Sequence, residues 1–247
     1  MKKIVFVLFL VILFSLPAYA QMENLNLGIG HFNYSDLSYF EELAKEFNSN
    51  ENIKDKIKVE QGYSFYAGGT YKLNELFKVK GEFNSSESIY GDGSYYIKEI
   101  VGNIEKDGIE ITTVTEGRKS FDLSLNNITG KVIFDLHDYI NISLGPAIVF
   151  GTYKEEYKHL EAQKVKAIEK DTGIIIEGEK IIDEGGYLIN ENIFDLGFEA
   201  GITAKYYIGN NMDVYADISY RYLETEIDEQ RLDLSGIKIG LGILLNY

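Results

Sequence analysis

The chain ends in residues 236–247, which read GIKIGLGILLNY. Every second side chain of this stretch is apolar, from Ile237 to Tyr247, and the positions between them are glycine or polar residues apart from Leu244. Successive side chains of a β-strand point to opposite sides, so a period of two predicts a strand. One face of that strand is apolar, and the other is small or polar.

Seven earlier segments repeat this alternation. They lie at residues 25–29, 63–71, 77–83, 128–136, 140–150, 196–208 and 212–222. Leu123 and Leu125 precede the fourth segment in the opposite phase, which predicts a β-bulge near Asn127. Pro146 lies inside the fifth segment, where it removes a donor from the hydrogen-bond ladder. The sequence therefore predicts eight strands.

The connections between these segments are alternately long and short. The long ones cover residues 35–60, 86–119, 154–191 and about 225–232. Short turns on one rim and long loops on the other are typical of transmembrane barrels, and closure leaves no sheet edge facing lipid. We predict an all-β, antiparallel up-and-down transmembrane barrel of eight strands, or of ten if a loop hairpin joins the wall.

A short helix is expected in the first long loop. Ser35 is a helix-capping residue type, and Asp36 suits the positive end of the helix dipole. The following apolar residues fall on one helical stripe: Leu37, Phe40, Leu43, Ala44 and Phe47. This stripe either binds a partner or packs on neighbouring loop residues.

The second and third long loops carry their own patterns. Residues 94–101 and 108–115 predict a hairpin in the second loop. In the third loop, residues 154–168 are charged and open to a helical interpretation, and residues 173–182 predict a hairpin around Gly178. Both long excursions could bind a partner or pack on each other.

The N-terminus has the three parts of a secretory signal peptide. Lys2 and Lys3 precede an apolar run over residues 4–14, and Ala18 and Ala20 form a small-x-small cleavage site. The run is shorter than the roughly 20 apolar residues of a spanning helix. We expect residues 1–20 to be removed, and residues 21–247 to form the exported barrel.

The export signal, the eight alternating segments, the unequal loops and the aromatic final residue Tyr247 together resemble the small eight-stranded outer-membrane β-barrel family of Gram-negative-type bacteria. This resemblance covers essentially the whole mature chain. It implies an outer-membrane location with both termini periplasmic, and outer-membrane lipid around the barrel. It also implies that the barrel-assembly machinery recognises the C-terminal strand, through Leu241, Ile243, Leu245 and Tyr247.

Charged residues recur on the face opposite to the apolar one, and we predict that they meet inside the barrel. They are Lys78, Lys80, Glu82, Lys131, Asp135, Glu199, Lys205, Asp213, Asp217, Arg221 and Lys238. Such a row could conduct ions. The lumen of an eight-stranded barrel is only just wide enough for its own side chains, so we expect these charges mainly to pair with each other.

Composition excludes several functions. The chain has no cysteine, so thiolate metal sites and cysteine nucleophiles are absent. Its 39 acidic and 24 basic residues offer no basic surface for a nucleic acid. His31, His137 and His159 stand in no catalytic pattern with a nucleophile and an acid. We predict no cofactor, no metal and no enzymatic activity.

The leading hypothesis is a non-enzymatic outer-membrane protein with a closed or very narrow lumen. Its acidic loops would serve surface interaction, with a ligand the sequence does not identify, or envelope integrity. Three alternatives remain open: a small porin, a lipid-modifying enzyme, and a soluble exported barrel with its apolar faces inward. Period-two alternation does not decide which face points outward. Outward-facing Ile239, Ile218 and Phe198 would favour the membrane.

Overall fold

A computed structural model describes residues 21–49, 52–74, 77–104, 109–168, 175–209 and 211–247. The expected signal peptide, with its cleavage residues Ala18 and Ala20, lies outside the described residues and stays a prediction. Within the described ranges, no helix is long and apolar enough to cross a membrane.

The described residues form one helix and a series of strands that differ widely in length. In chain order these are β1 (Gln21–Tyr34), α2 (Ser38–Asn48), β2 (Ile53–Asp55), β3 (Glu60–Gln61), β4 (Tyr63–Lys72), β5 (Lys78–Ile104), β6 (Ile109–His137), β7 (Ile140–Ile168), β8 (Ile175–Gly209), β9 (Met212–Tyr222), β10 (Glu224–Ile227), β11 (Gln230–Asp233) and β12 (Gly236–Asn246).

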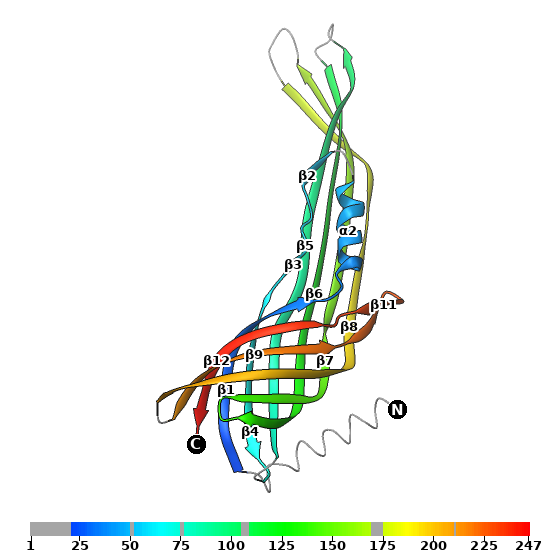
Figure 1. Ribbon diagram of the computed structural model, residues 1–247. Helices are drawn as coiled ribbons and strands as arrows, with labels where there is room; N and C mark the ends of the chain where they lie inside the picture. The colour runs from blue at the N-terminus through cyan, green and yellow to red at the C-terminus, as the bar shows by residue number, and fades with distance from the viewer. Residues whose placement is uncertain (1–20, 50–51, 75–76, 105–108, 169–174, 210) are drawn as a thin grey trace.

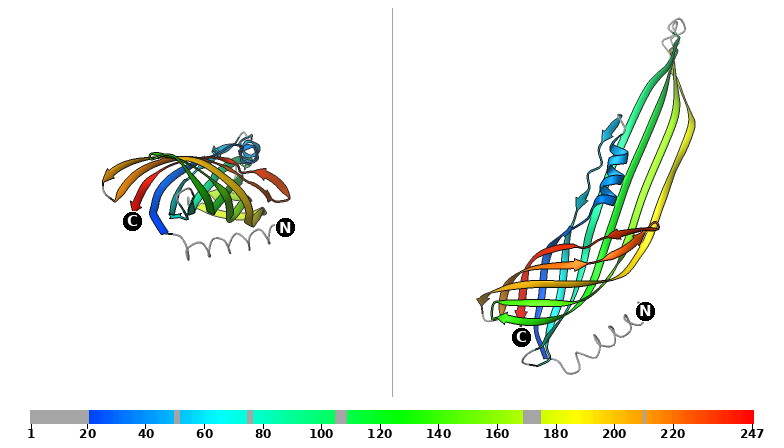
Figure 2. Two further views of the ribbon diagram at one scale, coloured as in Figure 1. Left: turned by 60° about the horizontal axis from the view of Figure 1, so that its bottom comes forward. Right: turned by 45° about the vertical axis from the view of Figure 1, so that its right-hand side comes forward.

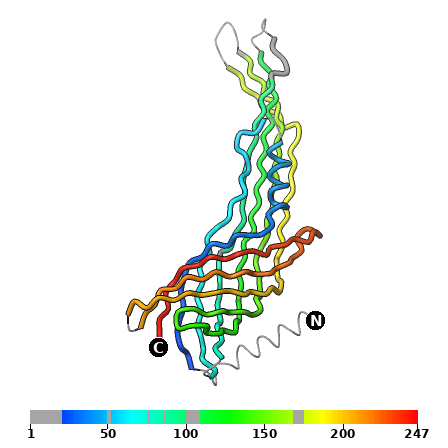
Figure 3. Tube along the Cα trace, in the orientation of Figure 1, coloured from blue at the N-terminus to red at the C-terminus, as the bar shows by residue number. Residues whose placement is uncertain are grey.

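Eight of these strands close into a ring of antiparallel neighbours. The order is β5, β4, β1, β12, β9, β8, β7 and β6, and β6 pairs again with β5. The register brings Gln21 opposite Lys72 and Asn24 opposite Asn246, so the start of β1 and the C-terminus lie at one rim (Figures 1 and 3). The predicted eight-stranded antiparallel barrel is confirmed.

The apolar face of the wall points outward. Ile239 and Ile218 are each 57% exposed and Phe198 is 45% exposed, whereas the neighbouring Lys238 and Glu199 are each 2% exposed. A soluble barrel would bury the first set and expose the second. This arrangement instead suits a closed barrel surrounded by hydrocarbon, because lipid accepts apolar side chains and cannot solvate charged ones.

Four adjacent strands continue far beyond the rim opposite to the start of β1 and the C-terminus. Strands β5, β6, β7 and β8 have 27, 29, 29 and 35 residues, whereas β4, β9 and β12 have 10 or 11. Their continuations form what we call the projecting sheet, residues 87–104, 109–125, 151–168 and 175–193 (Figures 1 and 2). Most of the predicted loops 86–119 and 154–191 is therefore strand.

Two expectations for the third loop are wrong. Residues 154–168 are not helical, and residues 175–182 are part of β8 and form no hairpin around Gly178, because β7 and β8 pair from Ile140 opposite Ala204 to Ile168 opposite Ile175, with one register shift between Glu161 and Ala162. Residues 173 and 174 of the expected hairpin lie outside the described residues. Alternation along β7 persists past the barrel, with Tyr153 and Glu155 buried between the exposed or half-buried Lys154 and Glu156. That period of two suits a strand and excludes an amphipathic helix.

The expected bulge lies on the neighbouring strand. Odd-numbered residues of β6 face inward without interruption from Leu123 through Asn127, and the register shift with β5 falls between Asn84 and Glu87. The opposite phase of Leu123 and Leu125 therefore reflects a change in the chemistry of the inner face. At Pro146 and Gly145 the β6–β7 ladder skips two pairs, which accommodates the missing donor.

The helix covers the inner face of the projecting sheet (Figure 1). Phe40, Ala44 and Phe47 of its predicted stripe are buried there. The helix begins at Ser38, and Asp36 Oδ1 accepts a hydrogen bond from the Ser38 N–H at 2.8 Å, so Asp36 holds the helix start instead of the predicted cap Ser35. The stripe packs within the protein, so it is not free to bind a partner.

Candidate functional site: the filled lumen and the projecting sheet

Glu82 is the centre of the polar interior. Its carboxylate lies 2.9 Å from Lys238 Nζ and 3.8 Å from Lys131 Nζ, and it also pairs with Lys80. These four residues come from β5, β6 and β12. Asn26 on β1 donates a further hydrogen bond to Glu82 at 3.1 Å. Side chains from different parts of the wall therefore meet across the lumen.

Two more carboxylates complete this layer. Glu199 on β8 lies 2.5 Å from Lys131 Nζ and 3.6 Å from Lys238 Nζ. Asp217 on β9 lies 3.9 Å from Lys238 Nζ and accepts a hydrogen bond from the Tyr66 hydroxyl at 2.9 Å. Because Lys238 is only 2% exposed, this ammonium group depends on the surrounding carboxylates for its stability.

A second buried pair lies nearer the projecting sheet. Arg221 on β9 is 1% exposed, and its guanidinium lies 2.6 Å from the Glu87 carboxylate on β5. The guanidinium also stacks over the Phe32 ring at 4.1 Å, and Asn127 Nδ2 donates to Glu87 at 3.0 Å. The sequence pattern missed Glu87, because the bulge in β5 shifts it into the inward phase and it fell in a predicted loop.

The remaining members of the predicted charge row lie near the rim that carries the termini. Lys78 Nζ pairs there with Glu23 at 2.6 Å and with Asp135 at 2.9 Å, and Asp135 is exposed. Asp213 accepts a hydrogen bond from Asn246 Nδ2 at 3.0 Å. Lys205, half-buried, lines a cavity of about 20 Å³ at this end of the lumen, space for about one water molecule.

Both faces of the wall change polarity at one level, most clearly on β6. Outward residues are apolar as far as Ile128 and then become Asn126 and Ser124. The inward residues Lys131, Thr129 and Asn127 are polar, and the next inward residue is Leu125, which is fully buried. The outer face of the neighbouring strands changes at the same row, because Ser124 pairs with Thr152 and Thr152 pairs with Asn192.

Beyond this level the inner face is an apolar core. It is built from the helix, the projecting sheet and the β10–β11 hairpin, and its members include Phe32, Phe40, Phe47, Ile57, Ile89, Phe121, Leu123, Leu125, Tyr153, Ile193, Leu223, Ile227 and Leu234. Leu223, Ile227 and Leu234 are each at most 1% exposed. The core lies directly above the charged layer.

A polar network crosses the inner face of the projecting sheet. Glu155 accepts hydrogen bonds from the Tyr153 hydroxyl at 2.6 Å and the Tyr187 hydroxyl at 2.7 Å, and pairs with Lys119 at 3.2 Å. Burial alone would raise the pKa of Glu155, but these donors and the ammonium charge outweigh it and hold the pKa below its ordinary value of 4.5. The carboxylate therefore ties three strands together.

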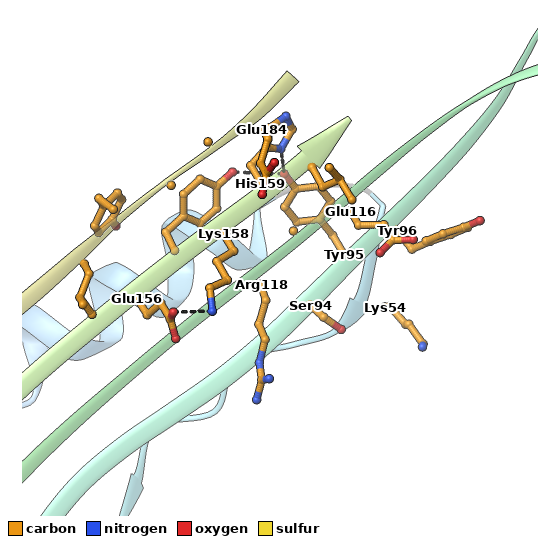
Figure 4. A pocket seen from close by; sticks show the side chains of 17 residues that line it. Lys54, Ser94, Tyr95, Tyr96, Glu116, Arg118, Glu156, Lys158, His159 and Glu184 are labelled. Atoms are coloured by element: carbon orange, nitrogen blue, oxygen red, sulfur yellow. Dashed lines mark hydrogen bonds and ion pairs between the residues drawn. The ribbon is translucent and has the colours of Figure 1, made fainter. Parts of the chain in front are cut away.

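A hollow of about 880 Å³ lies farther along the projecting sheet (Figure 4). Arg118 and Lys158 extend over it, and Lys158 pairs with Glu156 at 2.6 Å. Tyr95 lies beside it, and its hydroxyl is 2.7 Å from His159 Nδ1. Burial raises the pKa of the Tyr95 phenol, so this hydroxyl is neutral at physiological pH.

The three histidines lie in different parts of the molecule. His31 is on β1 beside the Tyr63 ring, His137 stacks on Tyr139 at the rim with the termini, and His159 is in the projecting sheet. They do not converge on one site. Among the described residues there is also no group of three or more acidic, histidine or cysteine side chains that could hold a metal ion.

Comparison with protein-family models gives a match over nearly the whole chain. A family model described as an outer membrane protein beta-barrel domain matches residues 6–243. No curated protein matches the sequence.

Solved structures of low sequence identity also match, and three of them serve as examples. Ail, the attachment invasion locus protein of Yersinia pestis, is 12% identical, with 92% of this chain and 98% of that one covered and a TM-score of 0.33. Neisserial surface protein A is 10% identical, with 91% of this chain and 96% of that one covered and a TM-score of 0.32. CarO2 of Acinetobacter baumannii is 7% identical, with 92% of this chain and 100% of that one covered and a TM-score of 0.35.

Proposed function

This chain belongs to the outer-membrane β-barrel domain family of Gram-negative bacteria, and within that family we propose that it is a closed, non-enzymatic barrel that holds a rigid sheet outside the cell. The lumen would pass no solute. The projecting sheet would meet surface partners or stabilise the envelope.

The observation that carries this proposal is the paired charge layer across the lumen. Lys238 contacts carboxylates from three other strands, at Glu82, Glu199 and Asp217, and all four side chains are buried. Opening a water path here would separate ion pairs that fix each other in place. Separating such a pair would leave each charge without its partner in the low-dielectric interior, which is strongly destabilising. The layer therefore resists opening.

The apolar core above this layer supports a closed mouth and a rigid display. Leu223, Ile227 and Leu234 from the β9–β12 connection pack against Phe32 at the top of the lumen. The helix then fastens the projecting sheet through Phe40 and Phe47. A sheet with its own core holds a binding surface in one conformation, which lowers the ordering cost of recognition.

Orientation and assembly are part of the same proposal. We place both termini in the periplasm and the projecting sheet outside the cell, because long excursions of family barrels face outward and tight turns face inward. Residues 1–20 would be the cleaved export signal. The assembly machinery would recognise the outward side chains of β12, namely Leu241, Ile243, Leu245 and Tyr247.

Conductance across a planar bilayer tests the closed lumen. The refolded chain from residue 21 should insert without steady ion steps above the lipid background, and so should the variant Lys205→Gln at the rim. Stable steps that change when Glu82 or Lys238 is neutralised would overturn the closed barrel and establish a small porin. A change in envelope-lipid composition on expression would instead indicate an enzyme.

A further inference from the structure

Residues 53–61 run alongside β5 as a strap that connects the helix to β4. Ile53 pairs with Tyr95, and Glu60 pairs with Tyr90. The strap contains three lysines, Lys54, Lys56 and Lys58, and all three are exposed. They recur at every second position, and Asp55 lies between the first two.

The strap is held in one position by Ile57. This side chain is 3% exposed and lies over Gly91 and Gly93, where an added Cβ would come within 2.8 Å and 2.5 Å of it. The Asn48 side chain forms hydrogen bonds with both backbone polar groups of Ile57. Its Nδ2 donates to the Ile57 carbonyl at 2.9 Å, and its Oδ1 accepts from the Ile57 N–H at 2.9 Å. Because Ile57 points into the core, the flanking Lys56 and Lys58 are directed outward.

A hollow of about 440 Å³ lies between the strap and β5, and its carboxylates are already engaged. Asp55 accepts from the Ser94 hydroxyl at 2.8 Å, and Glu60 accepts from the Tyr90 hydroxyl at 2.6 Å. Asp92 is held by Arg118 through two hydrogen bonds, at 2.9 and 2.8 Å. The three lysines have no ion-pair partner among the described residues, so the hollow presents unpaired cations.

The height of the strap limits the ligands that can reach it. Tyr90 is about 23 Å along β5 from Phe83, the last apolar outward residue before Ser85 and Ser88, at a strand rise of about 3.3 Å per residue. With a typical strand tilt this is about 16 to 19 Å above the hydrocarbon boundary. The polar layer of a phospholipid leaflet is only about 5 to 8 Å thick.

We infer that the lysines of the strap bind phosphate groups carried on the headgroup sugars of glycolipids in the surrounding leaflet. Phosphate suits three unpaired ammonium groups, and a saccharide headgroup reaches a height that a phospholipid does not. Tyr90, which is 43% exposed at the edge of the hollow, offers a ring face to a sugar. Lys54 also lines the larger hollow, so the basic site continues into that surface (Figure 4). This inference rests on the outer-membrane location and is independent of whether the lumen conducts.

The test measures glycolipid binding by the refolded full-length mature chain in detergent micelles. The probes are a glycolipid with phosphate monoesters on its headgroup sugars, the same glycolipid after phosphatase treatment, and phosphatidylglycerol. The variant K54Q/K56Q/K58Q removes the site. The matched control K164Q/K166Q/K180Q removes three exposed positive charges near the far end of the projecting sheet.

The phosphorylated glycolipid should bind the native chain at least tenfold more tightly than either of the other lipids. The strap variant should lose this preference, and the control should keep it within twofold. Equal binding of the phosphatase-treated lipid, or equal losses in the two variants, would overturn the inference. Equally tight binding of soluble inositol hexakisphosphate would overturn the lipid source and indicate a receptor for free polyanions. Because the substituted lysines are exposed, native strand content by circular dichroism should be unchanged in both variants.

Discussion

Leu125 and Asn126 are consecutive residues of β6, and between them the polarity of both faces of the wall reverses. Below this point the outer face of β6 is apolar, and the inner face begins with the polar residues Asn127, Thr129 and Lys131. Above it the outer face is polar and the inner face is an apolar core. One continuous strand thus passes from a membrane wall into a water-exposed sheet without a break in its period of two, because only the chemistry of each face changes.

Removal of the central lysine should destabilise the barrel. Lys238→Met removes the ammonium group that Glu82, Glu199 and Asp217 share, and the loss of one buried partner costs about 3–5 kcal/mol. Urea unfolding of the refolded protein in lipid vesicles should report a free energy of unfolding lower by that amount. Lys205→Met, a half-buried lysine at the rim, serves as the control and should change stability little. Equal losses in the two variants would refute the role of the central layer.

Replacement of Phe40, which packs the helix onto the projecting sheet, should loosen that sheet and leave the barrel folded. Phe40 is 1% exposed and packs 5.5 Å from the Phe121 ring, and Phe40→Ala removes packing worth about 3–5 kcal/mol. Limited proteolysis should then cut within the helix or residues 53–61 several times faster than in the native chain. Glu42→Ala, on the exposed side of the helix, should leave the cleavage rate unchanged. Resistance of Phe40→Ala to cleavage would show that the helix is held by other contacts.

Acid should weaken the projecting sheet through Glu155. Its pKa lies below 4.5 in the folded protein, so the stabilisation is complete above that pH and is lost as the pH falls through the lowered value. The near-ultraviolet circular dichroism of the buried tyrosines should therefore persist above pH 4.5 and decline as the pH falls further. Glu155→Gln should start from lower stability and show a smaller acid-induced decline. An identical decline in both proteins would assign the transition to other groups.

The closed barrel could be predicted from the sequence because its signal is a simple period of two. The alternating residues from Ile237 to Tyr247 indicate a strand with one apolar face, and the short turns indicate antiparallel neighbours. The outward direction of that face needed the structure, since the pattern is the same in a soluble barrel. The charged row was predicted as a set, but its partners in space were not, because residues such as Glu82 and Lys238 come from distant parts of the chain.

The projecting sheet could not be predicted from the same pattern. Alternation continues into residues 154–168, but the apolar positions there are fewer and face a small core beneath the helix instead of lipid. The change of phase at Leu123 and Leu125 was the available signal. This change of phase marks the level on β6 at which the apolar residues pass from the outer face to the inner face. A bulge was the simpler interpretation of the same pattern.

The most direct test of the account is a map of lipid and water contact along β6. The native chain has no cysteine, so single cysteines can be placed at outward positions 134, 128, 124 and 122 and at inward position 125, and each can carry a nitroxide spin label. In lipid vesicles, labels at 134 and 128 should collide with oxygen dissolved in the hydrocarbon, those at 124 and 122 with a water-soluble nickel complex, and that at 125 with neither. Nickel access at 128, or oxygen access without nickel access at 122, would contradict the membrane boundary on which the proposed function depends.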